Sequence, residues 1–163
     1  LEEIVRELWL LPEREYQYFA LELLERRIKK APPEIIHLLE DLILSKSWWD
    51  TIDGISPSLV GTLFKNYPAL IIPVTNKWMA SGNIWLQRSC ILFQLKYKGD
   101  MDLDLLYKFI DQLKGSKEFF IKKSIGWILR QYSKFNPDEV RRYVESTDLQ
   151  PLSVREALKY VDR

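Results

Sequence analysis

The chain has 163 residues, of which 47% are apolar and 29% are charged, a composition typical of one globular domain with a hydrophobic core. Its 24 Lys and Arg nearly balance 23 Asp and Glu, and the net charge of +1 excludes a strongly basic tail. One cysteine and one histidine exclude a disulfide framework, a thiolate metal site and a multi-histidine metal site. Apolar runs such as residues 69–74 are far too short to span a bilayer. We therefore expect a single cytoplasmic domain over residues 1–163 that holds no metal.

Apolar residues recur at helical spacing through nearly the whole chain. Leu21, Leu24 and Ile28 follow an i, i+3, i+7 pattern, which returns over residues 85–97 and 120–132. Ser47 and Asn136 are the predicted N-caps of the helices that follow them. Prolines mark the predicted boundaries of the helices, at Pro12, Pro32, Pro33, Pro57, Pro68, Pro73, Pro137 and Pro151. No segment has the sustained alternation of a strand, so the sequence predicts an all-α fold.

The sequence also repeats weakly at intervals of 35 and 36 residues. One structural position is occupied in turn by Gln17, Asp53, Arg88 and Lys123. This interval is typical of solenoids built from helix pairs, in which each repeat buries its face on its neighbours. We predict such a helical-repeat solenoid. Because Leu1 already lies inside a helical pattern, we also expect further helices upstream of it.

The register predicts a polar stripe along the inner surface of the solenoid. Equivalent positions on packed helices lie on the order of 10 Å apart, which brings Asp53 and Arg88 side by side. Trp49 lies one turn before Asp53, and Trp127 lies one turn after Lys123 on the same face. A carboxylate between two indoles favours a functional site. A purely structural ion pair between Asp53 and Arg88 is the alternative.

Basic residues are concentrated beside this stripe. Residues 85–99 and 114–134 together hold nine Lys or Arg and one acidic residue, Glu118. Basic residues interleaved with aromatic residues on a curved array favour binding to a polyanion backbone. The alternative is a solvated, lysine-rich face without a ligand.

Several blocks of the sequence resemble the AlkD-type DNA alkylation repair glycosylases. They are Ser-Trp-Trp-Asp-Thr-Ile-Asp at 47–53, Trp-Leu-Gln-Arg at 85–88, Ile-Leu-Phe-Gln-Leu-Lys-Tyr at 91–97, Glu-Phe-Phe-Ile at 118–121 with Gly-Trp at 126–127, and Pro-Leu-Ser-Val-Arg-Glu-Ala-Leu at 151–158. The resemblance extends from about residue 8 to the end of the sequence. It implies a HEAT-like superhelix with a concave basic face, and a family chain that is longer at its N-terminus.

The resemblance further implies a reaction and its site residues. The reaction is hydrolysis of the N-glycosidic bond of cationic N3- or N7-alkylated purines in double-stranded DNA, without a base-flipping pocket, in bacterial-type base excision repair. Asp53 matches the catalytic aspartate, and Trp49 and Trp127 match the active-site tryptophans. The residues expected to bind DNA are Arg88, which matches an arginine near the lesion backbone, and Lys96, Lys122, Lys123 and Arg130 from the basic segments. No cofactor is implied, and we expect a monomer.

A helical-repeat module that binds DNA or protein without catalysis is the alternative function. Such a module is expected to lack Asp53 or one of the two tryptophans, so the complete set favours an enzyme. His37 is predicted to be a residue of a helix surface or of the edge of the core rather than a catalytic base. Cys90 is predicted to be a small buried packing residue.

Overall fold

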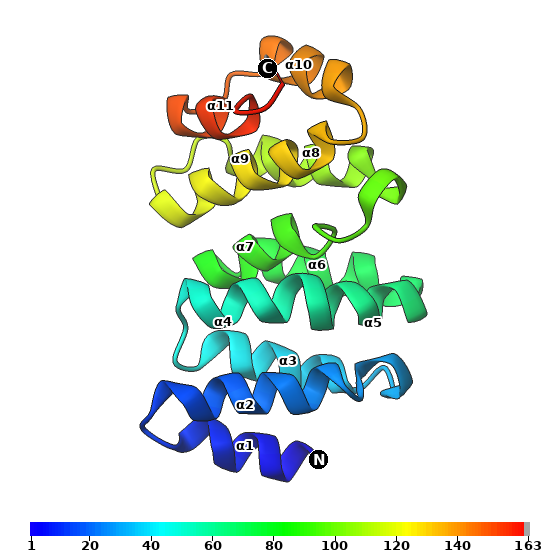
Figure 1. The fold of residues 1–163 in the computed structure, drawn as a ribbon, viewed down its shortest axis with the longest axis vertical. Coiled ribbons are helices and arrows are strands. Elements are labelled where there is room, and N and C mark those ends of the chain that lie inside the picture. The colour runs from blue at the N-terminus through cyan, green and yellow to red at the C-terminus, as the bar shows by residue number, and fades with distance from the viewer. Residues whose placement is uncertain (162–163) are drawn as a thin grey trace. The chain divides into compact units, whose positions relative to one another are not determined.

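The computed structural model describes residues 1–161, which are helical with no strand among them (Figure 1). The predicted all-α fold is confirmed. The chain divides into two compact units, Leu1–Ser89 (unit 1) and the residues from Cys90 onward (unit 2). Within the described range, no helix is long and apolar enough to cross a membrane.

Unit 1 is a stack of helices in which α1 packs on α2, and α3 packs on the helix that follows it (Figure 1). Its elements are α1 (Glu2–Leu10), α2 (Arg14–Glu25), η1 (Ile28–Lys30), α3 (Ile35–Leu44), α4 (Trp49–Gly54), η2 (Ile55–Val60), α5 (Gly61–Asn66), η3 (Pro68–Leu70), α6 (Ile71–Ala80) and most of α7 (Ile84–Leu92). Large side chains that are almost fully buried, such as Leu24, Ile52, Phe64 and Trp78, form its core. Burial of these apolar side chains is what holds the short helices together.

The helix that begins at Trp49 does not end at Pro57, so the predicted boundary there is wrong. Elements α4, η2 and α5 follow one another without a break, and η2 is a π-helical turn that contains Pro57. A proline has no N–H group to donate to the carbonyl four residues earlier, and its ring crowds that carbonyl. Widening the helix to a π turn accommodates Pro57, one turn beyond Asp53.

The two predicted N-caps have different outcomes. Asn136 is confirmed, because its side chain accepts a hydrogen bond of 3.1 Å from the backbone N–H of Glu139. Ser47 is not the cap of α4, because α4 begins at Trp49 and the Ser47 hydroxyl donates to the carbonyl of Ile43. The hydroxyl therefore satisfies the end of the preceding helix rather than the start of the next.

Unit 2 contains the end of α7, η4 (Lys98–Asp100), α8 (Leu103–Leu113), α9 (Phe119–Ser133), α10 (Pro137–Ser146) and α11 (Pro151–Ala157). Its closest packing is between α9 and α11. A Cβ atom added at Gly126 of α9 would lie 2.5 Å from the Cβ of Glu156 and 3.0 Å from the carbonyl oxygen of Ser153. Glycine at position 126 therefore lets the two helices approach.

We expect the Gly126→Ala substitution to destabilise the protein. Overpacking of this kind costs about 1–3 kcal/mol, which outweighs the gain of about 1 kcal/mol in helix propensity from glycine to alanine. Urea-induced unfolding measures the difference. Gly115→Ala is a control for the added methyl group alone, since Gly115 lies in the turn after α8 and an added Cβ there meets nothing within 4 Å. A Gly126→Ala protein as stable as the wild type would contradict the close packing of α9 on α11.

Candidate active site

An ion pair between Asp53 of α4 and Arg88 of α7 lies at the centre of the predicted site in unit 1. The Arg88 Nε donates to Asp53 Oδ1 at 2.9 Å, and Nη2 donates to Oδ2 at 3.0 Å. This is the bidentate geometry that fixes a carboxylate most firmly. The register prediction that the two residues lie side by side is confirmed, and so is the ion pair that spacing alone left as an alternative.

The two partners differ in their access to solvent. The Arg88 side chain is 4% exposed, whereas the Asp53 side chain is 17% exposed. The buried guanidinium thus holds the carboxylate from the protein side. Because an ionised carboxyl group offers about four lone-pair directions, Asp53 keeps acceptor capacity beyond the two bonds to Arg88. The ion pair and partial access to solvent are therefore compatible.

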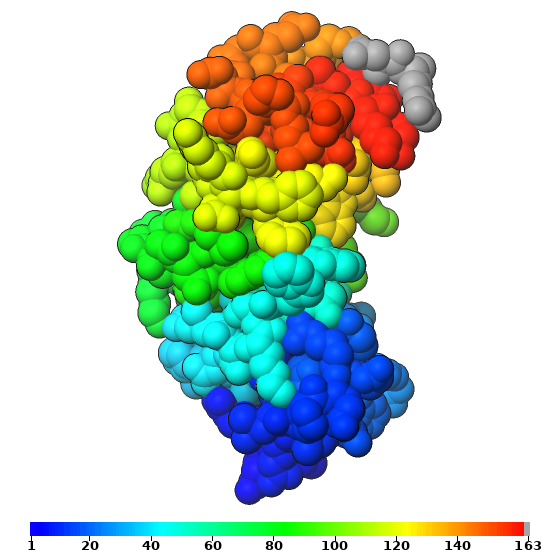
Figure 2. All heavy atoms as spheres, turned by 90° about the vertical axis from the view of Figure 1, so that its left-hand side faces the viewer, coloured from blue at the N-terminus to red at the C-terminus, as the bar shows by residue number. Residues whose placement is uncertain are grey.

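Tryptophans flank the start of α4. Trp49 is its first residue and is 47% exposed, one helical turn from Asp53. Trp48 is similarly exposed, and its ring packs against that of Trp85 with centroids 5.9 Å apart. Figure 2 shows the surface that the cyan start of α4 forms beside the blue α2. Such indoles give this end of unit 1 flat apolar faces in contact with water.

A second carboxylate, Asp50, lies close by but is fully engaged. The Arg14 Nε donates to Asp50 Oδ2 at 2.9 Å, and the Tyr18 hydroxyl donates to the same oxygen at 2.6 Å. The hydrogen bonds from Arg14, together with those from Tyr18 and the backbone of Thr51, outweigh burial and lower the pKa of Asp50 to about 2. Asp50 therefore anchors α4 to α2 as a permanent anion.

We expect the stability that Asp50 contributes to disappear in acid. The pKa of Asp50 is about 2 in the folded protein, against 3.8 for the same group in the unfolded chain. The difference stabilises the folded state by about 2 kcal/mol above pH 4, and this contribution is lost as the pH falls towards 2. Urea unfolding of the wild type and of Asp50→Asn should give a difference of that size at pH 7 and almost none near pH 2. A difference independent of pH would mean that the charge of Asp50 is unimportant.

The basic residues predicted to bind DNA in unit 2 lie mostly on α9. Lys123, Trp127 and Arg130 follow an i, i+4, i+7 spacing, so they share one face of the helix, and all three are half-buried. Lys122 is also half-buried, and Lys96, after α7, is exposed. The unit thus presents an indole between two cations on one helix face.

Both of these cations are ion-paired with Glu156 of α11. Its Oε1 lies 3.2 Å from Lys123 Nζ, and its Oε2 accepts a hydrogen bond of 2.6 Å from Arg130 Nη1. Burial raises the pKa of Glu156, but Lys123 and Arg130 together lower it by more than burial raises it. The net shift of the pKa is therefore downward. The carboxylate is therefore charged at neutral pH.

Comparison with known proteins identifies the family. The sequence profile of a family described as "DNA alkylation repair enzyme" matches residues 1–161. The chain belongs to the DNA alkylation repair enzyme family. It is 32% identical to a solved structure described as "Predicted DNA alkylation repair enzyme from Enterococcus faecalis", with a TM-score of 0.89 over 97% of this chain and 74% of that one. No curated protein matches. Membership of this family supports a role in the repair of alkylated DNA.

In this member of the family, the predicted polar stripe is wrong at its first position. Gln17 is 1% exposed, and its Nε2 lies 3.0–3.3 Å from the carbonyl oxygens of Leu8, Trp9 and Leu11. The last carbonyls of a helix have no partner within it. Gln17 therefore caps the C-terminal end of α1 in the interior and is not available to a ligand.

The grouping of Asp53 with the two tryptophans and the contact of Arg88 with DNA stay predictions. Asp53 and Trp49 lie in unit 1, whereas Trp127 lies in unit 2, so the expected grouping of the three is untested. The expected contact of Arg88 with DNA is untested too, although its guanidinium is buried and directed at Asp53. Asp50 and Glu156 were not predicted as partners of cations. The spacing of 36 residues between Arg14 and Asp50 would have indicated the first of these pairs.

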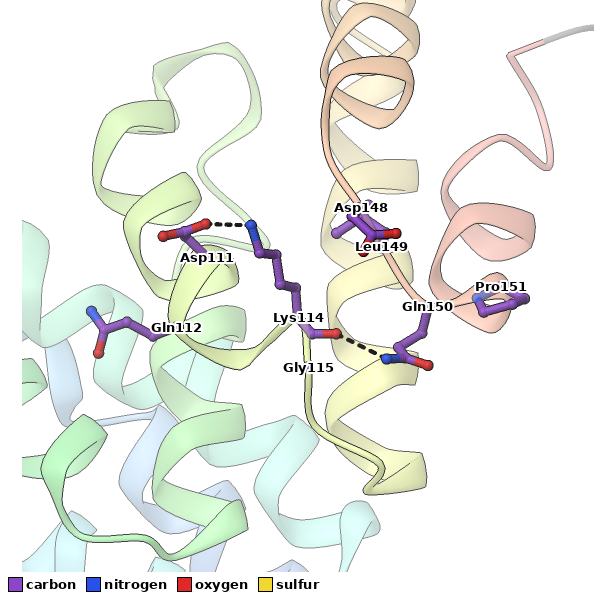
Figure 3. Close-up of a pocket in the computed structure, with 8 residues that line it drawn as sticks. All are labelled: Asp111, Gln112, Lys114, Gly115, Asp148, Leu149, Gln150 and Pro151. Carbon is purple, nitrogen blue, oxygen red and sulfur yellow. Dashed lines mark hydrogen bonds and ion pairs between the residues drawn. The ribbon is translucent and has the colours of Figure 1, made fainter.

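A pocket in unit 2 contains none of the predicted site residues. It lies where α8 ends and α11 begins, and is lined by Asp111, Gln112, Lys114, Gly115, Asp148, Leu149, Gln150 and Pro151 (Figure 3). The Lys114 ammonium pairs with Asp111 at 2.6 Å, and the Gln150 amide donates to the Lys114 carbonyl at 3.3 Å. The first contact lies within the last turn of α8, and the second joins the end of α8 to the segment before α11, so both have a structural role.

His37 and Cys90 fit their predicted roles as ordinary structural residues. His37 is exposed on α3, and Cys90 is fully buried, which raises the pKa of its thiol. Among residues 1–161, no group of three or more His, Cys, Asp or Glu side chains is placed to hold a metal ion.

Proposed function

We propose that this chain is a DNA glycosylase that removes cationic N3- or N7-alkylated purines, such as 3-methyladenine and 7-methylguanine, from double-stranded DNA. The observation that carries the proposal is the Asp53 carboxylate, fixed by Arg88 yet partly exposed, one helical turn from the exposed Trp49. Membership of the DNA alkylation repair enzyme family supports it. We further propose that residues 1–163 act as one domain and as a monomer, in bacterial-type base excision repair in the cytoplasm.

The proposed substrate explains why one carboxylate is enough. Glycosidic cleavage generally needs an acid to protonate the leaving group and a second carboxylate to assist at the sugar. An N3- or N7-alkylated purine already carries a positive charge. When its bond to C1′ breaks, the bonding electron pair neutralises the base, so no proton donor is needed. Water then supplies a hydroxyl group to C1′ and releases a proton, which leaves an abasic site.

Asp53 acts on the charge that develops at the sugar. Loss of the base leaves an oxocarbenium-like deoxyribose, and a fixed carboxylate stabilises it without having to reorganise. Arg88 holds the Asp53 carboxylate in place, because its two hydrogen bonds leave that carboxylate a single orientation. The remaining lone pairs of Asp53 orient the attacking water.

The two tryptophans pack on the deoxyribose. Trp49, and in this proposal Trp127, present the faces of their rings to the cationic sugar, a cation–π contribution of about 0.5–2 kcal/mol each. Because the contacts are made to the sugar and not around the base, the base remains outside any flipping pocket. Such a site tolerates bulky adducts.

Cationic side chains hold the phosphates on either side of the lesion. Lys96, Lys122, Lys123 and Arg130 are the proposed contacts, and phosphate contacts position DNA without reading its sequence. A phosphate contact of Arg88 is the alternative to its role in fixing Asp53. This binding should weaken steeply with salt, because each neutralised phosphate releases a condensed counterion.

Release of free base from alkylated duplex DNA tests the proposal. The chain is incubated with DNA treated with a methylating agent, and 3-methyladenine and 7-methylguanine are measured by chromatography against a sample without protein. Release above that background is the expected result. Salt-sensitive binding of duplex DNA without any release would instead support the alternative, a helical-repeat binding module that lacks catalysis.

A further inference from the structure

Glu156 of α11 pairs with both cations of the α9 face that carries Lys123, Trp127 and Arg130. Each of its oxygens engages a different cation, Lys123 at 3.2 Å and Arg130 at 2.6 Å. The Glu156 side chain is only 16% exposed. The carboxylate therefore occupies, between two cations, the kind of position that a phosphate oxygen of bound DNA would take.

Two contacts with α9 fix the backbone around Glu156. The absence of a side chain at Gly126 brings the Cβ of Glu156 against α9. One turn of α11 earlier, the buried hydroxyl of Ser153 donates to the carbonyl of Lys122 at 2.8 Å. These two contacts hold α11 in place along α9, so the position of the carboxylate is set by packing and not by the two flexible cations.

Glu156 lowers the positive charge of the α9 face. Lys123 and Arg130 alone would present two positive charges on either side of Trp127. With Glu156 included, the net charge of the group is +1. Any polyanion that binds these cations must compete with a carboxylate already in contact with both.

We propose that Glu156 is a specificity-determining residue that lowers the affinity of the α9 face for DNA in general. It competes with phosphate for Lys123 and Arg130, so that undamaged duplex is held weakly. This inference rests on the proposed function, because it requires that these two cations contact DNA. Discrimination between alkylated and undamaged DNA then depends on Asp53 and the tryptophans instead of on bulk electrostatic attraction.

The test is the Glu156→Gln substitution, which keeps the size of the side chain and removes its charge. Binding to an unmodified duplex is followed by fluorescence anisotropy from 50 to 300 mM salt. We expect affinity at about 0.1 M salt to increase about threefold to tenfold. Two released cations should also steepen the slope of log affinity against log salt by up to about 2. Damage to a merely structural contact would lower affinity or leave it unchanged.

Glu145→Gln is the matched control. Glu145 is exposed on α10, in the same unit as Glu156. Its substitution by glutamine changes the net charge by the same amount. A gain of similar size in both variants would overturn the inference, because it would reflect net charge alone. Introducing Lys123→Gln and Arg130→Gln together with Glu156→Gln should abolish the gain, and a gain that persists in this triple variant also overturns it.

The same experiment separates this inference from the proposed function. If the wild type releases alkylated base but Glu156→Gln binds undamaged duplex no more tightly, only the role of Glu156 is wrong. If the wild type binds no duplex and releases no base, the proposed function itself is wrong. If Glu156→Gln unfolds, Glu156→Asp retains the charge but shortens the reach to both cations, and it should raise affinity by a smaller factor. Unchanged affinity in a folded Glu156→Asp protein then counts against the inference.

Discussion

Replacing Asp53 with asparagine is expected to reduce the rate of base release from alkylated DNA by about 10²–10³-fold. Losses of this size follow the removal of one preorganised electrostatic group from an active site. A charge pair about 4 Å apart near a protein surface is worth about 4 kcal/mol, which corresponds to about a thousandfold in rate. The positive charge of Arg88 offsets part of the electrostatic field of Asp53. We therefore expect a loss of rate nearer to about 10²-fold than to 10³-fold.

The same substitution should leave DNA binding intact. It removes a negative charge, so the affinity for duplex DNA should not fall and weaker binding cannot account for lost activity. The fold should survive at a cost. An asparagine amide would turn one N–H group towards the Arg88 guanidinium or break a hydrogen bond with it, which costs about 1–3 kcal/mol in the free energy of unfolding. Activity is therefore measured well below the melting temperature of the variant.

Asp41→Asn is the control for this experiment. Asp41 also lies in unit 1 and pairs with an arginine, Arg6 at 2.8 Å, but both side chains are about half exposed. The control variant makes the same chemical change at a surface ion pair of little energetic value. Base release should be unchanged in Asp41→Asn. If Asp53→Asn releases 7-methylguanine at the wild-type rate, Asp53 is not the catalytic carboxylate.

The helical fold and the Asp53–Arg88 pair were predictable from the sequence. Helical periodicity requires only the order of apolar residues, which burial in the core then satisfies. The pair follows from an interval of 35 residues, because equivalent positions of successive repeats face each other. The same reasoning applied to Arg14 and Asp50, 36 residues apart, would have given the second ion pair of α4.

The direction of individual side chains was not predictable in this way. Gln17 shares the register of Asp53 but turns into the interior, because the end of α1 has carbonyl groups that need donors. Glu156 lies 33 residues beyond Lys123 and 26 beyond Arg130, neither of which is the repeat interval. Its contacts depend on how closely Gly126 lets α11 approach α9, which is a property of three-dimensional packing.

Replacing Arg88 with alanine is expected to impair both stability and catalysis. Breaking a buried ion pair costs about 3–5 kcal/mol, and the partial exposure of Asp53 places this case near the lower value. The freed carboxylate can rotate, and misplacement of a catalytic group by about 1 Å can cost about a hundredfold in rate. Arg88→Lys retains the charge but not the two parallel hydrogen bonds. It should recover more of the stability than of the rate of base release.

Combining Arg88→Ala with Asp53→Asn distinguishes the two roles that Arg88 can have. If Arg88 acts through Asp53, its removal from the Asp53→Asn protein lowers base release little further, since residues that act as a unit are not additive. If Arg88 instead contacts a phosphate, its removal weakens duplex binding in either background and reduces the salt slope by about 1. The buried guanidinium and its two bonds to Asp53 favour the first outcome. Equal losses of activity in the wild-type and Asp53→Asn backgrounds would show that Arg88 does not act by positioning the carboxylate.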